Sequence, residues 1–88
     1  MSAPESAPDM AIRELLEYLV RGVVDEPDEV SVEQFDQDDG SILLELAVAE
    51  QDYGMIIGRR GRTVQALRIV VKAAAARDHR RVFIDLVD

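Results

Sequence analysis

The 88-residue chain has no cysteine, one histidine, four aromatic side chains and no long apolar run. The absence of cysteine excludes disulfides and thiolate metal sites, and it fits a reducing compartment. A single histidine argues against a zinc site or a catalytic triad, and the carboxylates lie in turn and surface contexts without a neighbouring nucleophile. No apolar run approaches the roughly 20 residues that span a bilayer, and the first residues lack the features of a signal peptide. We therefore expect a soluble, cytoplasmic protein that is not an enzyme, with no metal, cofactor, small-molecule substrate or membrane partner.

The formal net charge of -8 is distributed very unevenly along the chain. Residues 1–54 hold two basic and 15 acidic side chains, whereas residues 55–81 hold eight basic and one acidic. The first segment therefore carries a net charge of -13, the second +7, and residues 82–88 carry -2. Such asymmetry predicts one face that attracts polyanions and another that repels them. The overall acidity therefore does not exclude a nucleic-acid partner.

The length allows one domain, which we place at residues 9–88 after a disordered tail at 1–8. Apolar residues at helical spacing predict a first helix that ends before Pro27, and alternating apolar residues predict strands. The expected elements, in chain order, are a helix at 10–24, strands at 30–35 and 42–49 with a turn at 36–41, one or two helical turns at 51–57, a glycine turn at 58–61, a helix at 62–76 and a strand at 81–87.

These elements predict an α+β fold in which the helices pack on one face of a three-stranded sheet. The first two strands should pair as an antiparallel hairpin. The last strand follows a helix and can return parallel to an earlier strand, but the pattern does not decide which one. The four aromatic residues are too scattered for a base-stacking platform, so we expect most of them in the core. They are Tyr18, Phe35, Tyr53 and Phe83.

The stretch IIGRRGR places two glycines around two arginines, directly before the helix expected at 62–76. The glycines lack a Cβ, so the backbone can approach a ligand closely and can adopt positive φ. The arginines add charge beside the positive end of that helix, an arrangement that favours phosphate. Ile57, directly before the first glycine, can line an apolar groove for bases or pack in the core. The candidate nucleic-acid-binding residues are therefore Ile57, Gly58, Arg59, Arg60, Gly61 and Arg62.

The same residues admit other interpretations of this turn. A nucleotide P-loop needs a longer glycine spacing followed by lysine, and a dinucleotide fingerprint needs a third glycine in a βαβ unit. A tight connection between helices with solvated arginines remains a simple alternative, because short glycine motifs recur by chance. Further along the helix, Arg68 and Lys72 share a basic face, which is either solvated or a secondary contact with nucleic acid or with a partner.

The context of the turn resembles a K-homology (KH) domain, in which a GXXG loop clamps about four nucleotides. The wider sequence is similar to one family, the small bacterial KH-domain RNA-binding proteins called KhpA or YlqC. Three stretches carry the resemblance: EYLVRGVVDEPDEV at 17–30, DYGMIIGRRGRTVQALRIVVKAAA at 52–75 and the closing VFIDLVD. One position departs from the family, since Met55 stands where a lysine is common.

The resemblance implies a type II KH domain of order αββααβ, with the GXXG loop at 58–61. It also implies binding of single-stranded RNA and a role as an RNA chaperone or post-transcriptional regulator linked to cell shape and to envelope or cell-wall biogenesis. Family members are further expected to form a homodimer, or a heterodimer with a larger KH-containing protein called KhpB, Jag or EloR. The alternative is a protein-interaction adaptor on a KH scaffold with little RNA binding, for which the acidity, Met55 and the scarcity of aromatics argue.

Overall fold

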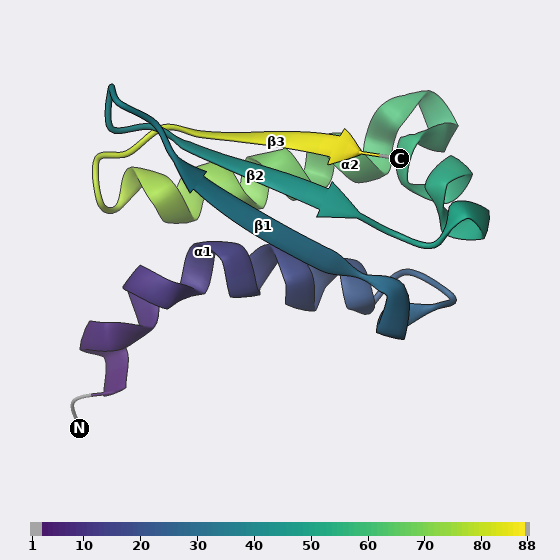
Figure 1. The fold of residues 1–88 in the computed structure, drawn as a ribbon, viewed down its shortest axis with the longest axis horizontal. Helices are drawn as coiled ribbons and strands as arrows, with labels where there is room; N and C mark the ends of the chain where they lie inside the picture. The colour runs from purple at the N-terminus through teal and green to yellow at the C-terminus, as the bar shows by residue number, and fades with distance from the viewer. Residues whose placement is uncertain (1–2, 88) are drawn as a thin grey trace.

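The computed structural model describes the backbone of residues 3–87 and the side chains of 12–58 and 61–87. Figure 1 shows two long helices and one sheet. The elements are α1 (Ala3–Arg21), a short 3-10 helix (Pro27–Glu29), β1 (Ser31–Asp36), β2 (Ile42–Ala47), α2 (Glu50–Ala76) and β3 (Val82–Val87). Each strand lies within about two residues of the expected one.

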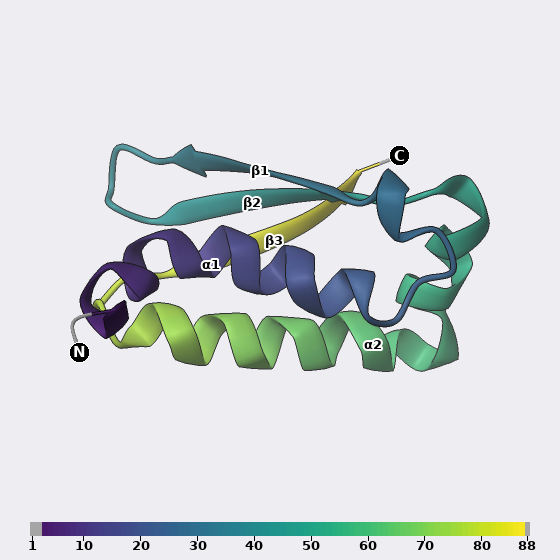
Figure 2. The ribbon, with the colours of Figure 1, turned by 90° about the horizontal axis from the view of Figure 1, so that it is seen from below.

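The three strands form one sheet in the order β1-β2-β3. β1 and β2 pair antiparallel, with Phe35 opposite Leu43, so the expected hairpin is confirmed. β3 pairs parallel to β2, with Phe83 beside Leu43, which settles the neighbour that the sequence pattern left open. Figure 2 shows both helices on one side of this sheet, and the opposite side carries no helix among the described residues. The predicted α+β architecture is therefore confirmed.

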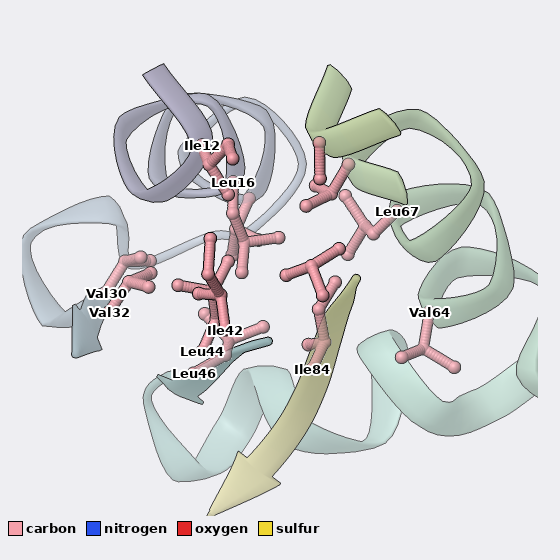
Figure 3. Packing of buried hydrophobic residues seen from close by; sticks show 14 of the residues in the cluster. Ile12, Leu16, Val30, Val32, Ile42, Leu44, Leu46, Val64, Leu67 and Ile84 are labelled. Atoms are coloured by element: carbon pink, nitrogen blue, oxygen red, sulfur yellow. The ribbon is translucent and has the colours of Figure 1, made fainter. Parts of the chain in front are cut away.

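The core lies between the sheet and the two helices, where one face of each strand meets the apolar stripe of each helix (Figure 3). Alternate residues of β2 point inward, and Ile42, Leu44 and Leu46 are almost fully buried. Leu16 of α1 and Val71 of α2 are completely buried against them. Apolar burial of this kind is the main favourable term in folding, about 25 cal/mol per Å² of area removed from water. The residues that the helical and strand periodicities mark as inward-facing thus belong to one core.

α1 begins earlier than the sequence predicts. The helix starts at Ala3 rather than near residue 10, and so takes in residues 3–8 of the expected disordered tail; residues 1 and 2 lie outside the described residues. Pro4 is compatible with this start, because a first-turn N–H has no intrahelical partner to lose. Figure 1 shows these first turns extending beyond the sheet. At the other end, α1 stops at Arg21, three residues before the expected end.

α2 contains the glycine turn inside one element. The sequence predicts two helices separated by a loop, whereas the structure assigns helix from Glu50 to Ala76. Gly61 nevertheless has φ of 73°, which lies outside the right-handed helical region. Figures 1 and 2 show the consequence, two helical arms that meet at a sharp bend. The element order αββααβ is therefore kept, and we call residues 50–60 the first arm and residues 62–76 the second arm.

The four aromatic side chains do not lie where the sequence predicts. Tyr18 is 76% exposed, Phe35 43% and Phe83 48%, and Tyr53 is only half-buried. The aliphatic residues of the two helices and of the inner sheet face already fill the core, so the aromatics remain on its outside. The two phenylalanines occupy the uncovered side of the sheet.

Within residues 3–87, neither α1 nor α2 has a stretch apolar enough, at sufficient length, to cross a membrane.

Candidate nucleic-acid interface

The two glycines of the turn are used differently by the fold. Gly61 needs to be glycine for its backbone, because φ of 73° is strained for any residue with a Cβ, although a Cβ would have room 3.8 Å from Val64 Cγ1. Gly58 has no positive φ, and a Cβ built on it would meet nothing within 4 Å. The fold alone therefore gives no reason for glycine at position 58, where it costs roughly 0.5–1 kcal/mol relative to alanine.

The two isoleucines before the turn point in opposite directions. Ile56 is completely buried in the core, whereas the side chain of Ile57 is 46% exposed. This resolves the ambiguity in favour of an exposed position for Ile57, next to the turn rather than beneath it. Met55 is also exposed, at 37%, so its replacement of the family lysine changes a surface charge rather than the packing.

The arginines of the turn differ in what the structure describes. Arg62 is exposed at the start of the second arm. Arg59 and Arg60 have helical backbone between the two glycines, and their side chains lie outside the described residues. The N-terminal end of the second arm lies at the same place, and the positive end of a helix dipole favours anions. The bend thus gathers an exposed isoleucine, an open glycine and a cationic helix start.

A buried carboxylate that the sequence did not mark as functional holds the first arm in position. Asp52 is 1% exposed, and its Oδ1 and Oδ2 accept hydrogen bonds of 3.0 Å from the backbone N–H groups of Asp25 and Glu26. These bonds join the first arm to the segment that follows α1. The sequence carries only a weak signal for this role, an aspartate in the first turn of a helix, because its partners lie 26 and 27 residues away.

The two candidate secondary contacts do not lie at the turn. Arg68 is half-buried, and its Nη2 donates a 3.4 Å hydrogen bond to the carbonyl oxygen of Ile84 on β3. Lys72 is exposed and lines a hollow of about 260 Å³ together with Arg80 and Arg81. At 1.5 Å per residue, Lys72 lies about 16 Å along the second arm from Gly61. Arg68 thus supports the sheet edge, and Lys72 belongs to a separate basic cluster.

That separate cluster is partly neutralised by the hairpin between β1 and β2. Arg80 Nη2 lies 3.4 Å from Asp36 Oδ1, and Arg81 Nη2 lies 3.5 Å from Asp39 Oδ2. Ser41 donates hydrogen bonds to Asp39 from its hydroxyl and its backbone N–H, and these bonds lower the pKa of the Asp39 carboxyl below its usual value. The cationic surface near the glycine turn is therefore distinct from the ion-paired surface at the far end of α2.

Comparison with known proteins gives a consistent result over most of the chain. The family described as KhpA/KhpB, KH domain, matches residues 13–86. A protein of Halalkalibacterium halodurans named RNA-binding protein KhpA is 44% identical over 77 residues, which are 88% of this chain and 100% of that protein. A protein of the same name from Clostridium acetobutylicum is 42% identical over 76 residues, 86% of this chain and 100% of the relative. A protein of the same name from Borreliella burgdorferi is 43% identical over 75 residues, which are 85% of this chain and 90% of that protein.

Solved structures support the same fold. A crystal structure of Era in complex with MgGDPNP and nucleotides 1506–1542 of 16S ribosomal RNA superposes with a TM-score of 0.61 at 20% identity, over 85% of this chain. A point variant of Aquifex aeolicus Era bound to GDP.AlF4- gives a TM-score of 0.54 at 24% identity. This chain spans only 28% and 27% of the two Era chains, so the likeness concerns one domain of each. With the type II KH arrangement of its elements and matches that span nearly the whole chain, this protein belongs to the KhpA/KhpB family of KH domains.

Proposed function

We propose that this protein binds single-stranded RNA by its sugar–phosphate backbone at the turn of residues 58–61. The observation that carries the proposal is the open space at Gly58, a helical glycine for which the fold has no need. A missing Cβ at that point lets a ligand backbone approach the helix closely. The names of the relatives, RNA-binding protein KhpA, agree with this class of ligand.

The surrounding residues fit the parts of a nucleotide. Arg59 and Arg60 between the glycines, together with the exposed Arg62, supply cations for phosphate oxygens. Exposed Ile57 offers an apolar surface on which an unstacked base can lie. The acidic segment of residues 1–54 repels polyanions elsewhere on the molecule, which favours binding at the turn.

The family resemblance supports a finer role as an RNA chaperone or post-transcriptional regulator connected to cell shape and the cell envelope. It also supports self-association or pairing with a larger KH-containing partner of the KhpB type. Two large apolar side chains on the second arm are consistent with such pairing, since Ile69 is 67% exposed and Val70 is 44% exposed. The same two residues favour the second candidate function, a protein-interaction adaptor on the KH scaffold.

Alanine at each glycine of the turn should separate binding from stability. Gly58→Ala is expected to raise the free energy of unfolding by roughly 0.5–1 kcal/mol, because it removes a helical glycine without a clash. The same change should weaken RNA binding about tenfold or more, since the added methyl group prevents close approach. Gly61→Ala should instead destabilise the fold by about 1–2 kcal/mol through its positive φ. Urea unfolding and fluorescence anisotropy with labelled oligouridine measure both effects, and unchanged affinity in Gly58→Ala would contradict the proposal.

The dependence of RNA affinity on salt should reveal the number of phosphates bound. If the three arginines of the turn neutralise about three phosphates, log K should fall against log salt with a slope of about -2 for a single strand. Anisotropy titrations with oligouridine over a range of potassium chloride concentrations measure this slope. A slope near zero would show that phosphates are not contacted, and a much steeper one would require the Lys72 cluster as well.

A further inference from the structure

The side of the sheet opposite the helices is a second surface with a defined chemistry. Because the core-facing residues of each strand alternate with outward ones, this side presents three residues from each strand. They are Ser31, Glu33 and Phe35 of β1, Leu43, Glu45 and Ala47 of β2, and Phe83, Asp85 and Val87 of β3. We call this set the open face. Figure 2 shows that neither helix covers it.

The register of the sheet sorts the open face into rows. One row is apolar, with Phe35 opposite Leu43 and Leu43 beside Phe83, and both phenylalanines are nearly half exposed. Aromatic side chains of this size bury much apolar area when a partner covers them. A row of three large apolar side chains, of which Phe35 and Phe83 are exposed and Leu43 is partly buried, is therefore a candidate contact surface for another molecule.

The neighbouring row is made only of carboxylates, Glu33, Glu45 and Asp85, at matching positions on the three strands. Adjacent strands lie about 4.8 Å apart, and like charges directly opposite each other destabilise a sheet. None of the three forms an ion pair with any residue whose side chain the structure describes. The fold thus holds three uncompensated carboxylates beside the apolar row.

On its other side the apolar row borders a hollow of about 590 Å³. Leu43 and Phe83 form its apolar wall, and the remaining wall is the hairpin, which contributes Asp36, Gln37, Asp38, Asp39 and Ser41. Two of these aspartates are paired with Arg80 and Arg81, but Asp38 has no ion pair within the described side chains. Carboxylates therefore flank the apolar row on both sides, and at its Phe83 end the row also borders the hollow lined by Lys72, Arg80 and Arg81.

We propose that the open face binds a segment of a partner protein in which apolar side chains are flanked by lysine or arginine. The apolar side chains would cover Phe35, Leu43 and Phe83, and the cations would neutralise the carboxylate row, relieving its repulsion. RNA is a poor occupant, because its phosphates would meet the carboxylates. A second copy that placed its basic second arm on this face would make a head-to-tail contact, which generates rings or open chains of molecules rather than a two-fold dimer.

The probe for this surface is a short amphipathic peptide of leucine and lysine, with a counterpart in which glutamate replaces each lysine. Amide NMR shifts of the intact protein should change along β1, β2 and β3 with the lysine peptide, and remain unchanged with the glutamate peptide. The triple variant Glu33→Gln, Glu45→Gln, Asp85→Asn should bind the lysine peptide about tenfold more weakly, as expected for three surface ion pairs of about 0.5 kcal/mol each. The variant Phe35→Ser, Phe83→Ser should lose binding through the apolar row.

A matched variant controls for general attraction between opposite charges. This control is the triple variant Glu14→Gln, Glu50→Gln, Asp78→Asn, which removes the same number of negative charges from exposed positions outside the open face. It should bind the lysine peptide within about twofold of the parent. Equal losses in the two triple variants, or shifts that map to other elements, would overturn the proposal.

Two other occupants have distinguishable signatures. If oligouridine changed the amide NMR shifts of the open face, that face would be an RNA surface. If sedimentation showed self-association of the parent that disappears in the open-face variants, the face would be a contact between copies. Either result overturns the proposal.

An independent readout is thermal stability. Glu45→Gln in the central strand should raise the melting temperature by a few degrees because it relieves repulsion from both neighbours, and a lowered value would show that the row is not strained.

Discussion

Reversing the charge of the glycine turn with Arg59→Asp and Arg60→Asp is expected to lower RNA affinity by at least about 100-fold while the fold remains intact. A hydrogen bond to a charged group contributes about 1.5–3 kcal/mol, and each 1.4 kcal/mol corresponds to a factor of ten. Two lost phosphate contacts therefore account for this loss, and the added carboxylates also repel the RNA. Gel shift or anisotropy with single-stranded RNA measures the effect, and circular dichroism checks the fold.

A control with the same change of net charge places the reversal elsewhere. Arg77→Asp and Arg81→Asp alter exposed arginines directly after α2 and directly before β3, at the opposite end of the second arm from the turn. These changes should weaken RNA binding less than about threefold, with a small loss of stability from the helix dipole. If both double variants lose affinity equally, attraction is a property of the whole molecule and not of the turn. If the turn variant keeps its RNA affinity, the turn is not the RNA-binding site, and the protein-interaction adaptor becomes the favoured function.

Replacing the buried carboxylate with Asp52→Ala is expected to reduce the free energy of unfolding by about 2–4 kcal/mol. The change removes two hydrogen bonds from the backbone N–H groups of Asp25 and Glu26 to a charged carboxylate, and a hydrogen bond to a charged group contributes about 1.5–3 kcal/mol. In a domain of this size a loss of 1 kcal/mol lowers the melting temperature by about 4–8 °C, so a fall of roughly 10–25 °C should be seen by circular dichroism.

Two further substitutions test the cause of that loss. Asp52→Asn keeps one acceptor oxygen and should therefore lie between the parent and Asp52→Ala. Asp28→Ala removes an exposed carboxylate for which no hydrogen bond or ion pair is seen among the described side chains, and it should change stability by less than about 0.5 kcal/mol. A large effect of Asp28→Ala, or none of Asp52→Ala, would show that the tether between α2 and the segment after α1 is unimportant.

The sequence by itself determined the secondary structure that depends on local pattern. Alternation over residues 42–49 and the helical stripe that follows the glycine turn identified β2 and the second arm of α2, because strands and helices repeat their inward residues with different periods. The concentration of positive charge at 55–81 and the glycine spacing identified a candidate site for polyanions. The start of α1 was less predictable, because Pro4 in the first helical turn is compatible with either a helix or a tail.

Only the tertiary structure decided the features that depend on residues far apart in sequence. The parallel pairing of β3 with β2 brings Phe83 beside Leu43, and Asp52 finds its donors 26 and 27 residues away. The burial of Ile56 and the exposure of Ile57 follow from the direction in which the first arm meets the sheet, which adjacent isoleucines in a sequence cannot reveal. Likewise, three carboxylates spread over residues 33–85 become a row only through strand register. Local periodicity fixes which residues face inward, but register and helix direction are set by how the whole core packs.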